Sequence, residues 1–137
     1  MRACGLVSVS FRDHTPEEIA AAAHACGLSC IEWGSDVHAP AADAARLAAV
    51  AAISVENHIR ISSYGSYFKI GRDALSDFPP YIRAAKALGT RIIRLWCGTK
   101  GYAAYTADEL ARLFADCREI ERIAAAADVI VCMECHG

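Results

Sequence analysis

The chain has 137 residues and a mass of 14.7 kDa, which is the size of one domain. Hydrophobic residues make up 55% and charged residues 22% of the sequence, so the chain can bury a core and is not a disordered protein. Fourteen basic and sixteen acidic residues give a net charge of −2, and no dense run of Lys and Arg indicates a nucleic-acid partner. Charges interrupt every apolar stretch before the roughly 20 residues that a membrane span needs. No signal-peptide pattern opens the sequence, so we expect a cytoplasmic protein without a membrane partner.

The seven cysteines are an odd number without a secretory signal, so we expect free thiols in a reducing compartment. Cys132 and Cys135 form a C-x-x-C pair, but this pair lies in a strand-like run. A spacing of three along a strand directs two side chains to opposite faces. Core and surface thiols are therefore expected here, and not a zinc or redox centre.

The first elements of the chain are a strand, a capped helix and a second strand. Gly5–Phe11 alternates apolar and polar residues, which predicts a strand. Thr15 and Glu18 form a capping box at the start of a helix, and Gly27 supplies its left-handed stop. Ser29–Gly34 is the next expected strand.

The middle of the chain repeats this alternation. Ala41–Glu56 predicts an Ala-rich helix, with Asn57 as its left-handed C-terminal residue. Arg60–Tyr64 is the third expected strand, and Gly65–Asp77 is expected to be a loop long enough to be functional. Phe78–Leu88 is expected to be helical, with two prolines confined to its first turn.

The last part of the chain adds two strands around a long helix. Arg91–Trp96 is the fourth expected strand, and Asp128–His136 is the fifth. Thr106 and Glu109 repeat the capping box, and their helix runs to about Ala127. Its expected buried stripe consists of Leu110, Leu113, Phe114, Cys117, Ile120 and Ala124.

Alternating strands and helices predict βαβ units and a parallel sheet. Two architectures have this order: an open flavodoxin-like sheet, whose five strands suit this length, and a (β/α)8 barrel, which needs about 250 residues. Length favours the open sheet. No G-x-G-x-x-G motif follows the first strand, where the sequence is Arg12-Asp13-His14-Thr15, and this counts against a dinucleotide-binding sheet.

Ionisable and aromatic side chains gather where the expected strands end, and this favours the barrel. The carboxyl ends of parallel strands form the ligand site in α/β folds. Glu32 and Arg94 could instead form a structural ion pair across neighbouring strands. The candidate site residues are Glu32, His38, Tyr64, Trp96, Glu134 and His136.

Four stretches, Thr15–His38, Ser62–Gly71, Ala85–Gly98 and Val129–Gly137, carry a family resemblance. In order and spacing they resemble the sugar phosphate isomerase/epimerase family, the xylose isomerase-like barrels, whose superfamily also contains endonuclease IV-like proteins. The resemblance covers essentially the whole chain but only the first half of the family's barrel. It implies one domain over residues 1–137, with the first five strands and four helices of a TIM barrel, apparently truncated after the fifth strand.

The resemblance also implies roles for individual residues. Glu134 would be the first ligand of a divalent metal such as Mn²⁺ or Mg²⁺ and a catalytic acid or base. The metal would polarise a sugar or sugar phosphate while carboxylates move a proton between adjacent carbons. His136 would bind substrate or support the metal ligand. The other substrate-binding residues would be Glu32, His38, Tyr64 and Trp96.

In the family, the remaining metal ligands come from the sixth to eighth strands, whereas this sequence stops at Gly137. Tight metal binding and full catalytic competence are therefore not expected of this chain alone. Two functions stay open: part of a metal-dependent sugar isomerase or epimerase, or a non-catalytic half-barrel that forms a homodimer or binds a small ligand. An endonuclease-like phosphodiesterase is less favoured, because it needs more histidines and a more basic surface.

Overall fold

Five strands and four α-helices alternate along the computed structural model, which describes residues 4–134. The strands are β1 (Gly5–Val7), β2 (Cys30–Gly34), β3 (Arg60–Ile70), β4 (Ile92–Cys97) and β5 (Ile130–Met133). The helices are α1 (Pro16–Ala25), α2 (Ala44–Glu56), α3 (Pro79–Ala87) and α4 (Ala107–Ala126). Short 3-10 helices cover Ser8–Phe11, Leu75–Asp77 and Tyr102–Ala104.

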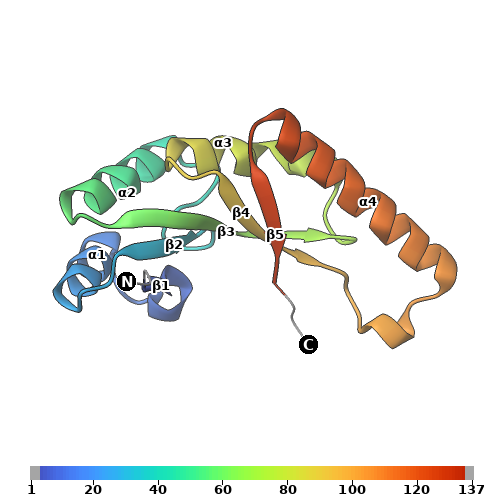
Figure 1. Ribbon diagram of the computed structural model, residues 1–137, viewed down its shortest axis with the longest axis horizontal. Coiled ribbons are helices and arrows are strands. Elements are labelled where there is room, and N and C mark those ends of the chain that lie inside the picture. Colours follow the sequence, from blue (N-terminus) through green and yellow to red (C-terminus); the bar gives the residue numbers. More distant parts are fainter. Residues whose placement is uncertain (1–3, 135–137) are drawn as a thin grey trace.

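All five strands form one parallel sheet in the order β1-β2-β3-β4-β5. A flavodoxin-like sheet would have the order 2-1-3-4-5, with helices on both faces. Here each strand lies beside its successor, and the helices follow the outer side of the curved sheet (Figure 1). This sequential winding is that of a TIM barrel, so the expected α/β fold is confirmed and the open-sheet alternative is excluded.

The core lies between the sheet and the helices because side chains alternate along each strand. Ile31 and Trp33 of β2, and Ile93 and Leu95 of β4, are fully buried on the helix side. The Trp33 indole donates a hydrogen bond to Ser54 of α2 at 3.0 Å, as expected for a tryptophan beneath a helix. The residues between these core positions point to the opposite, concave face of the sheet.

The two predicted capping boxes are confirmed. The Glu18 amide donates to the Thr15 hydroxyl, and the Thr15 amide donates back to the Glu18 carboxylate at 2.8 Å. Thr106 and Glu109 make the same reciprocal pair at the start of α4. Hydrogen bonds from Thr106, together with the Lys100 ammonium, lower the pKa of Glu109 to about 2.

The first strand is shorter than predicted. β1 ends at Val7, and residues 8–11 turn into a 3-10 helix. The turn brings the Ser8 hydroxyl under the end of β2, where it accepts a hydrogen bond from the Gly34 amide at 2.9 Å. A Cβ on Gly34 would lie 2.4 Å from Val9, so the glycine makes room for this crossing.

The third strand is longer than predicted, because β3 continues through Gly65 to Ile70. Phe68 and Ile70 are buried, and Lys69 pairs with Trp96 of β4 after an irregularity in the register. The expectation of a loop from Gly65 to Asp77 is therefore wrong over its first six residues.

Smaller corrections concern two helices. α2 begins after Asp43, whose carboxylate caps the Arg46 amide, rather than at Ala41. Asn57 is not left-handed, since its φ is −92°, and His58 takes the positive φ instead. On α4, Phe114 is 51% exposed and does not belong to the buried stripe.

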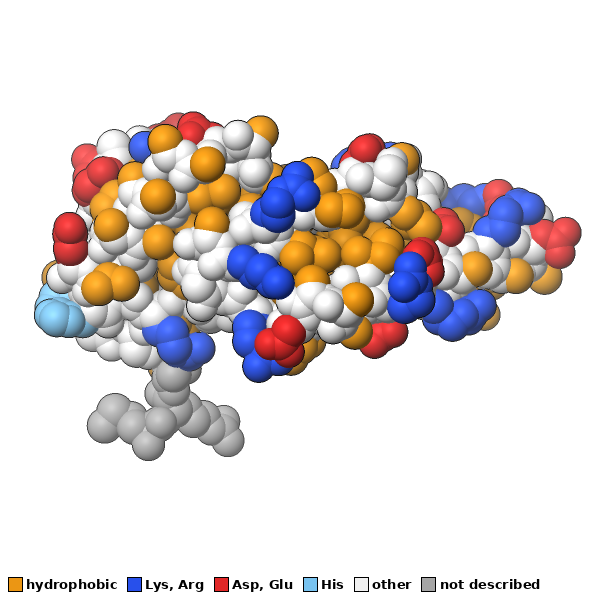
Figure 2. Space-filling view, turned by 90° about the horizontal axis from the view of Figure 1, so that it is seen from above, with side chains coloured by type: hydrophobic (Ala, Val, Ile, Leu, Met, Phe, Trp, Pro, Cys, Tyr) orange, Lys and Arg blue, Asp and Glu red, His pale blue; other side chains and the backbone are white. Residues whose placement is uncertain are grey.

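The outer surface carries charges of both signs, with apolar side chains between them, in the view from above over α2, α3 and α4 (Figure 2). None of the helices within residues 4–134 is long and apolar enough to span a membrane. The six cysteines in this part of the chain are free thiols, whereas Cys135, half of the C-x-x-C pair, lies outside the described residues.

Candidate functional site

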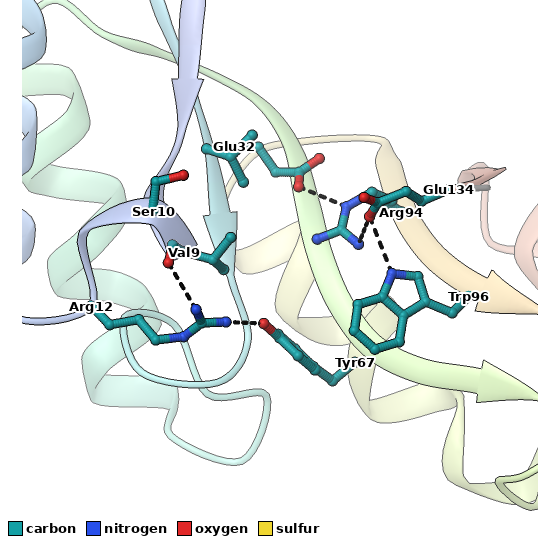
Figure 3. A pocket seen from close by; sticks show the side chains of 9 residues that line it. Val9, Ser10, Arg12, Glu32, Tyr67, Arg94, Trp96 and Glu134 are labelled. Carbon is teal, nitrogen blue, oxygen red and sulfur yellow. Dashed lines mark hydrogen bonds and ion pairs between the residues drawn. The ribbon is translucent and has the colours of Figure 1, made fainter. Parts of the chain in front are cut away.

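A cavity of about 490 Å³ opens at the carboxyl ends of the strands, on the concave face of the sheet. Residues from β1, the 3-10 turn after it, β2, β3, β4 and the end of β5 contribute side chains to it (Figure 3). The lining residues are Val7, Val9, Ser10, Arg12, Glu32, Tyr67, Arg94, Trp96 and Glu134.

Arg94 joins two carboxylates at the centre of this cavity. Its Nε lies 2.8 Å from Glu32 Oε1, and its Nη1 lies 2.5 Å from Glu134 Oε2. The Glu32 and Arg94 side chains are each only 12% exposed, whereas the Glu134 side chain is 40% exposed. The buried pair is thus a fixed part of the fold, and Glu134 is the carboxylate that a ligand can reach.

Glu32 and Arg94 form the ion pair that the sequence suggested, but their strands are not neighbours. β3 runs between β2, which carries Glu32, and β4, which carries Arg94. The pair reaches across β3 at Gly65. A Cβ on Gly65 would lie 2.7 Å from Glu32 Oε1 and 2.8 Å from Arg94 Nη2. The missing side chain of Gly65 is therefore what lets the ion pair span three strands.

Further hydrogen bonds orient the two carboxylates. The Ser63 hydroxyl of β3 donates to Glu32 Oε2 at 2.7 Å, so both oxygens of Glu32 have partners. The Trp96 indole donates to Glu134 Oε2 at 3.1 Å. The rings of Tyr67 and Trp96 pack edge to face, with their centroids 5.1 Å apart. They form an aromatic surface that suits the C–H side of a sugar.

Arg12 forms a second fixed cation at the rim of the cavity. Its guanidinium donates to the Val9 carbonyl at 2.9 Å, to the Asp36 carboxylate at 2.5 Å and to the Tyr67 hydroxyl. These partners come from three different segments, so Arg12 ties the loops after β1 and β2 to β3. Burial acts to raise the pKa of Asp36, but hydrogen bonds from Arg12 and the Val37 amide outweigh it and lower that pKa.

Of the predicted site residues, Glu32, Trp96 and Glu134 line the cavity together. His38 and Tyr64 do not, since both are fully buried. His136 lies outside the described residues.

His38 connects two loops beneath the cavity. Its Nε2 lies 3.1 Å from the His14 carbonyl, which can only accept, so Nε2 carries the proton. Its Nδ1 then accepts from the Ser8 hydroxyl at 3.1 Å. Both ring nitrogens are therefore occupied within the protein.

Tyr64 packs in the core on the helix side of β3. Its hydroxyl donates to the Ala39 carbonyl at 2.7 Å, and its ring packs against Tyr81. Burial raises the pKa of Tyr64. The even-numbered residues of β3 around Gly65, among them Tyr64 and Phe68, face the helices, so the predicted strand end at Tyr64 was the wrong marker for the concave face.

Several cavity residues were not among the predicted site residues, and Arg12, Tyr67 and Arg94 are the most polar of them. Arg12 follows the first expected strand, but the 3-10 turn that redirects it carries no clear sequence signal. The sequence predicts a loop at Tyr67, because it predicts that the third strand ends at Tyr64. Arg12 follows the end of β1, and Tyr67 and Arg94 lie in the carboxyl-terminal halves of β3 and β4, so a search of the carboxyl ends of the strands could have found them.

The described residues do not form a metal site by themselves. No group of three or more His, Cys, Asp or Glu side chains with a metal-ligating arrangement occurs between residues 4 and 134. Glu32 has both carboxylate oxygens occupied by protein donors, and Glu134 Oε2 contacts Arg94 and Trp96. This part of the chain offers Glu134 as one hard oxygen ligand at most.

Comparison with known proteins identifies what the fold resembles. The family model for the xylose isomerase-like TIM barrel matches residues 20–137. The chain is similar in structure to the probable 3-DHS dehydratase AsbF, involved in petrobactin synthesis, from Bacillus anthracis, with 20% identity and a TM-score of 0.83. This match covers 98% of the chain and 53% of the dehydratase.

Two further structures show the same fold. A xylose isomerase domain protein from Alicyclobacillus acidocaldarius has 15% identity, a TM-score of 0.73 and coverages of 98% and 50%. A xylose isomerase domain containing protein from Salmonella typhimurium has 10% identity, a TM-score of 0.73 and coverages of 97% and 50%. The chain thus spans about half the length of these structures and matches half of a TIM barrel. No curated protein matches the chain in sequence.

Replacing Gly65 by alanine tests the bridge across β3. The new Cβ would force Glu32 and Arg94 apart, so we expect Gly65→Ala to lower the free energy of unfolding by about 1–3 kcal/mol. Urea unfolding measures this change. Gly101→Ala is the matched control, because a Cβ there meets nothing within 4 Å and its φ is −64°. Equal stabilities for the two variants would contradict the bridging role of Gly65.

Replacing Arg12 by methionine tests the rim. The variant loses the hydrogen bond and the charge of Arg12, which lower the pKa of Asp36, while burial still raises it, so we expect that pKa to rise. In the wild type that pKa is lowered, so the pair stabilises the fold above the carboxyl's unfolded pKa. This contribution is lost as the pH falls through the folded pKa. Carboxyl ¹³C NMR titration measures the shift. Arg122→Met, which removes the partner of Glu119 on α4, is the control and should leave the pKa of Asp36 unchanged. An unchanged pKa of Asp36 in Arg12→Met would refute the role of Arg12.

Proposed function

Since the chain belongs to the xylose isomerase-like TIM barrel family, we propose that it forms half of an active site that moves a proton on a small polyhydroxylated substrate. The reaction class is isomerisation or epimerisation of a sugar or sugar phosphate. Glu134 is the proposed acid or base. The observation that carries this proposal is the reachable Glu134 carboxylate, held by Arg94 and Trp96 at the carboxyl end of the sheet.

The position of Glu134 supports the role of a general base. It follows β5 at the edge where parallel α/β folds bind ligands. Arg94 and the Trp96 indole both contact Oε2, so the carboxylate has a defined orientation. A positioned carboxylate within reach of a substrate C–H or O–H can accept its proton.

Arg94 has two proposed tasks in this reaction. It orients Glu134 through their ion pair, and its guanidinium edge in the cavity can also stabilise negative charge that develops on a substrate oxygen. Glu32 balances the charge of Arg94 and keeps it in place. Trp96 and Tyr67 would pack against the sugar carbons, while the hydroxyl-bearing face meets the charged groups.

A divalent metal is a separate part of the proposal. Among residues 4–134, Glu134 is the ligand that we propose, and the other ligands would come from outside these residues. When bound, such an ion would polarise a carbonyl or hydroxyl of the substrate. The steps assigned above to Glu134, Arg94 and Trp96 involve proton transfer and orientation only.

The dehydratase among the structural relatives widens the range of reactions to test. In a carbonyl compound, loss of water from adjacent carbons can begin, as isomerisation does, with removal of a proton next to the carbonyl. The acid–base step is common to these reactions, whereas the substrate is not fixed by the fold.

A second candidate is a half-barrel module completed by a second copy of the chain. Val7, Ile92 and Ile130 take positions on the concave face and are 39%, 37% and 56% exposed. Within the described residues, β1 pairs only with β2 and β5 only with β4, so two strand edges have open hydrogen-bonding groups. A second half-barrel would cover both features.

Glutamine at position 134 tests the proton-transfer proposal without removing the hydrogen-bond acceptor. Deuterium exchange from D₂O into ketoses and aldoses, followed by NMR, detects the step without knowledge of the net reaction. We expect Glu134→Gln to slow the exchange by about 10²–10⁴-fold, because an amide cannot accept the proton. Glu56→Gln at the exposed end of α2 is the control and should keep the wild-type rate. Exchange at the wild-type rate in Glu134→Gln would refute the assignment, and Mn²⁺ titration of both variants tests the metal ligand.

Solution mass distinguishes the second candidate from the first. A homodimer of half-barrels predicts twice the mass of 14.7 kDa in light scattering. Ile130→Lys at the β5 edge would place a charge in the joint, so we expect the dimer to dissociate. Val55→Lys, on the exposed side of α2, is the control. A monomeric wild type would rule out the homodimer.

A further inference from the structure

We propose that the substrate carries an anionic group, a carboxylate or a phosphate, and that Lys69 binds it in a second cavity on the other side of Trp96. This inference rests on the proposed function and narrows its substrate class. The second cavity has a volume of about 300 Å³ and lies next to the first. Its lining includes Lys69, Trp96, Thr99, Lys100 and Glu134.

The two cavities share Trp96 and Glu134, so one ligand can occupy both. Among residues 4–134, Trp96 and Glu134 line both the 490 Å³ cavity and the 300 Å³ cavity. The indole therefore stands between them, with its Nε1 on the Glu134 carboxylate. A polyhydroxylated chain at Glu134 would have one end beside Arg94 and the other beside Lys69.

The charges of the two cavities differ. In the first, Arg94 is paired with Glu32 and Glu134, and Arg12 with Asp36. In the second, Lys100 is held by Glu109, with its Nζ 2.9 Å from each carboxylate oxygen. Lys69 has no such ion pair with any carboxylate in residues 4–134.

The Asp73 carboxylate near Lys69 is occupied by other groups. Asp73 interacts electrostatically with Lys69, but its two oxygens accept hydrogen bonds from Arg72 at 2.6 and 2.8 Å. The backbone amide of Lys69 takes the remaining contact at 2.8 Å. Arg72 therefore balances the charge of Asp73 without a contribution from the Lys69 ammonium.

Contacts with Trp96 place the Lys69 ammonium at the second cavity. Lys69 pairs with Trp96 in the register of β3 and β4, and its Nζ lies 5.0 Å from the centre of the indole ring. A cation over an aromatic face is attracted to it, but the ring does not neutralise its charge. Thr99 lines the same cavity, and its hydroxyl, 3.4 Å from the Tyr105 hydroxyl, can donate a hydrogen bond to a ligand there. An oxyanion is the chemical group that fits a cation and a hydroxyl in this arrangement.

The two tryptophans of the chain allow a direct NMR test of anion binding. The indole of Trp96 lies at the cavity, whereas the indole of Trp33 is buried and bonded to Ser54, so ¹H–¹⁵N NMR has a reporter and an internal reference. Inorganic phosphate is the first probe. We expect it to shift the Trp96 indole signal in a saturable way and to leave Trp33 in place.

Three variants assign the effect to Lys69. Lys69→Met keeps the aliphatic stem on Trp96 but removes the charge, so phosphate binding should weaken about tenfold or more. Lys69→Arg should bind within about threefold of the wild type, because the charge is retained. Lys86→Met on α3 removes an exposed charge elsewhere and should have no effect. An unshifted Trp96 signal in the wild type, or equal phosphate binding in Lys69→Met, would overturn the proposal.

Three organic probes separate the sources of the anion and keep the two proposals distinct. Gluconate and fructose 6-phosphate carry a carboxylate and a phosphate, and the tighter of the two identifies the group that Lys69 prefers. Neutral fructose should bind at least about tenfold more weakly than the better anion, and this difference should vanish in Lys69→Met. Fructose binding as tight as both anions overturns the anion site while leaving proton transfer at Glu134 intact. Phosphate binding at Lys69 without any deuterium exchange would support the anion site and refute the proposed reaction.

Discussion

The ion pair between Glu32 and Arg94 is the interaction on which the concave face depends. The two side chains are each only 12% exposed, their opposite charges face each other, and Ser63 satisfies the second oxygen of Glu32. The pair bridges β2 and β4 over Gly65, so three strands share one electrostatic contact. Arg94 then has its Nη1 available to orient Glu134, and the order of the site follows from the order of the pair.

The aromatic residues Trp96 and Tyr67 extend the contacts of this ion pair to the rest of the cavity. Trp96 donates to the carboxylate that Arg94 also holds, and its ring is supported from the side by Tyr67 and from above by the Lys69 ammonium. Tyr67 in turn accepts from Arg12, which is fixed by Asp36. A continuous set of contacts therefore runs from the loop after β1 to the end of β5, and loss of one member would disturb groups several strands away.

The sequence predicted the architecture well because the fold is encoded by local signals that repeat. The capping boxes at Thr15 and Thr106 fix two helix starts, and the alternation of strands and helices predicts the parallel sheet. The errors have a common physical cause, which is contact between segments distant in sequence. A glycine such as Gly65 is typical of a loop, and the sequence does not show that the Glu32 and Arg94 side chains cross over it within a strand. Ser8 and Val9 look like strand residues until Gly34 lies against them. The same limit applies to His38 and Tyr64, whose polar atoms are used up inside the protein.

The concave face has exposed apolar side chains and, at the carboxyl ends of the strands, the charged cluster of Glu32, Arg94 and Glu134. The two regions differ in whether they should be covered or left accessible. Val7, Ile92 and Ile130 gain from burial in an apolar joint, which would stabilise contact with a second half-barrel. Glu134 needs the opposite, since its 40% exposed carboxylate can act only while a ligand can reach it. A complete barrel satisfies both demands by closing around the apolar positions and leaving the carboxyl ends of the strands open. The half-barrel therefore has the apolar surface for assembly and the polar surface for chemistry on the same face, separated along the strands.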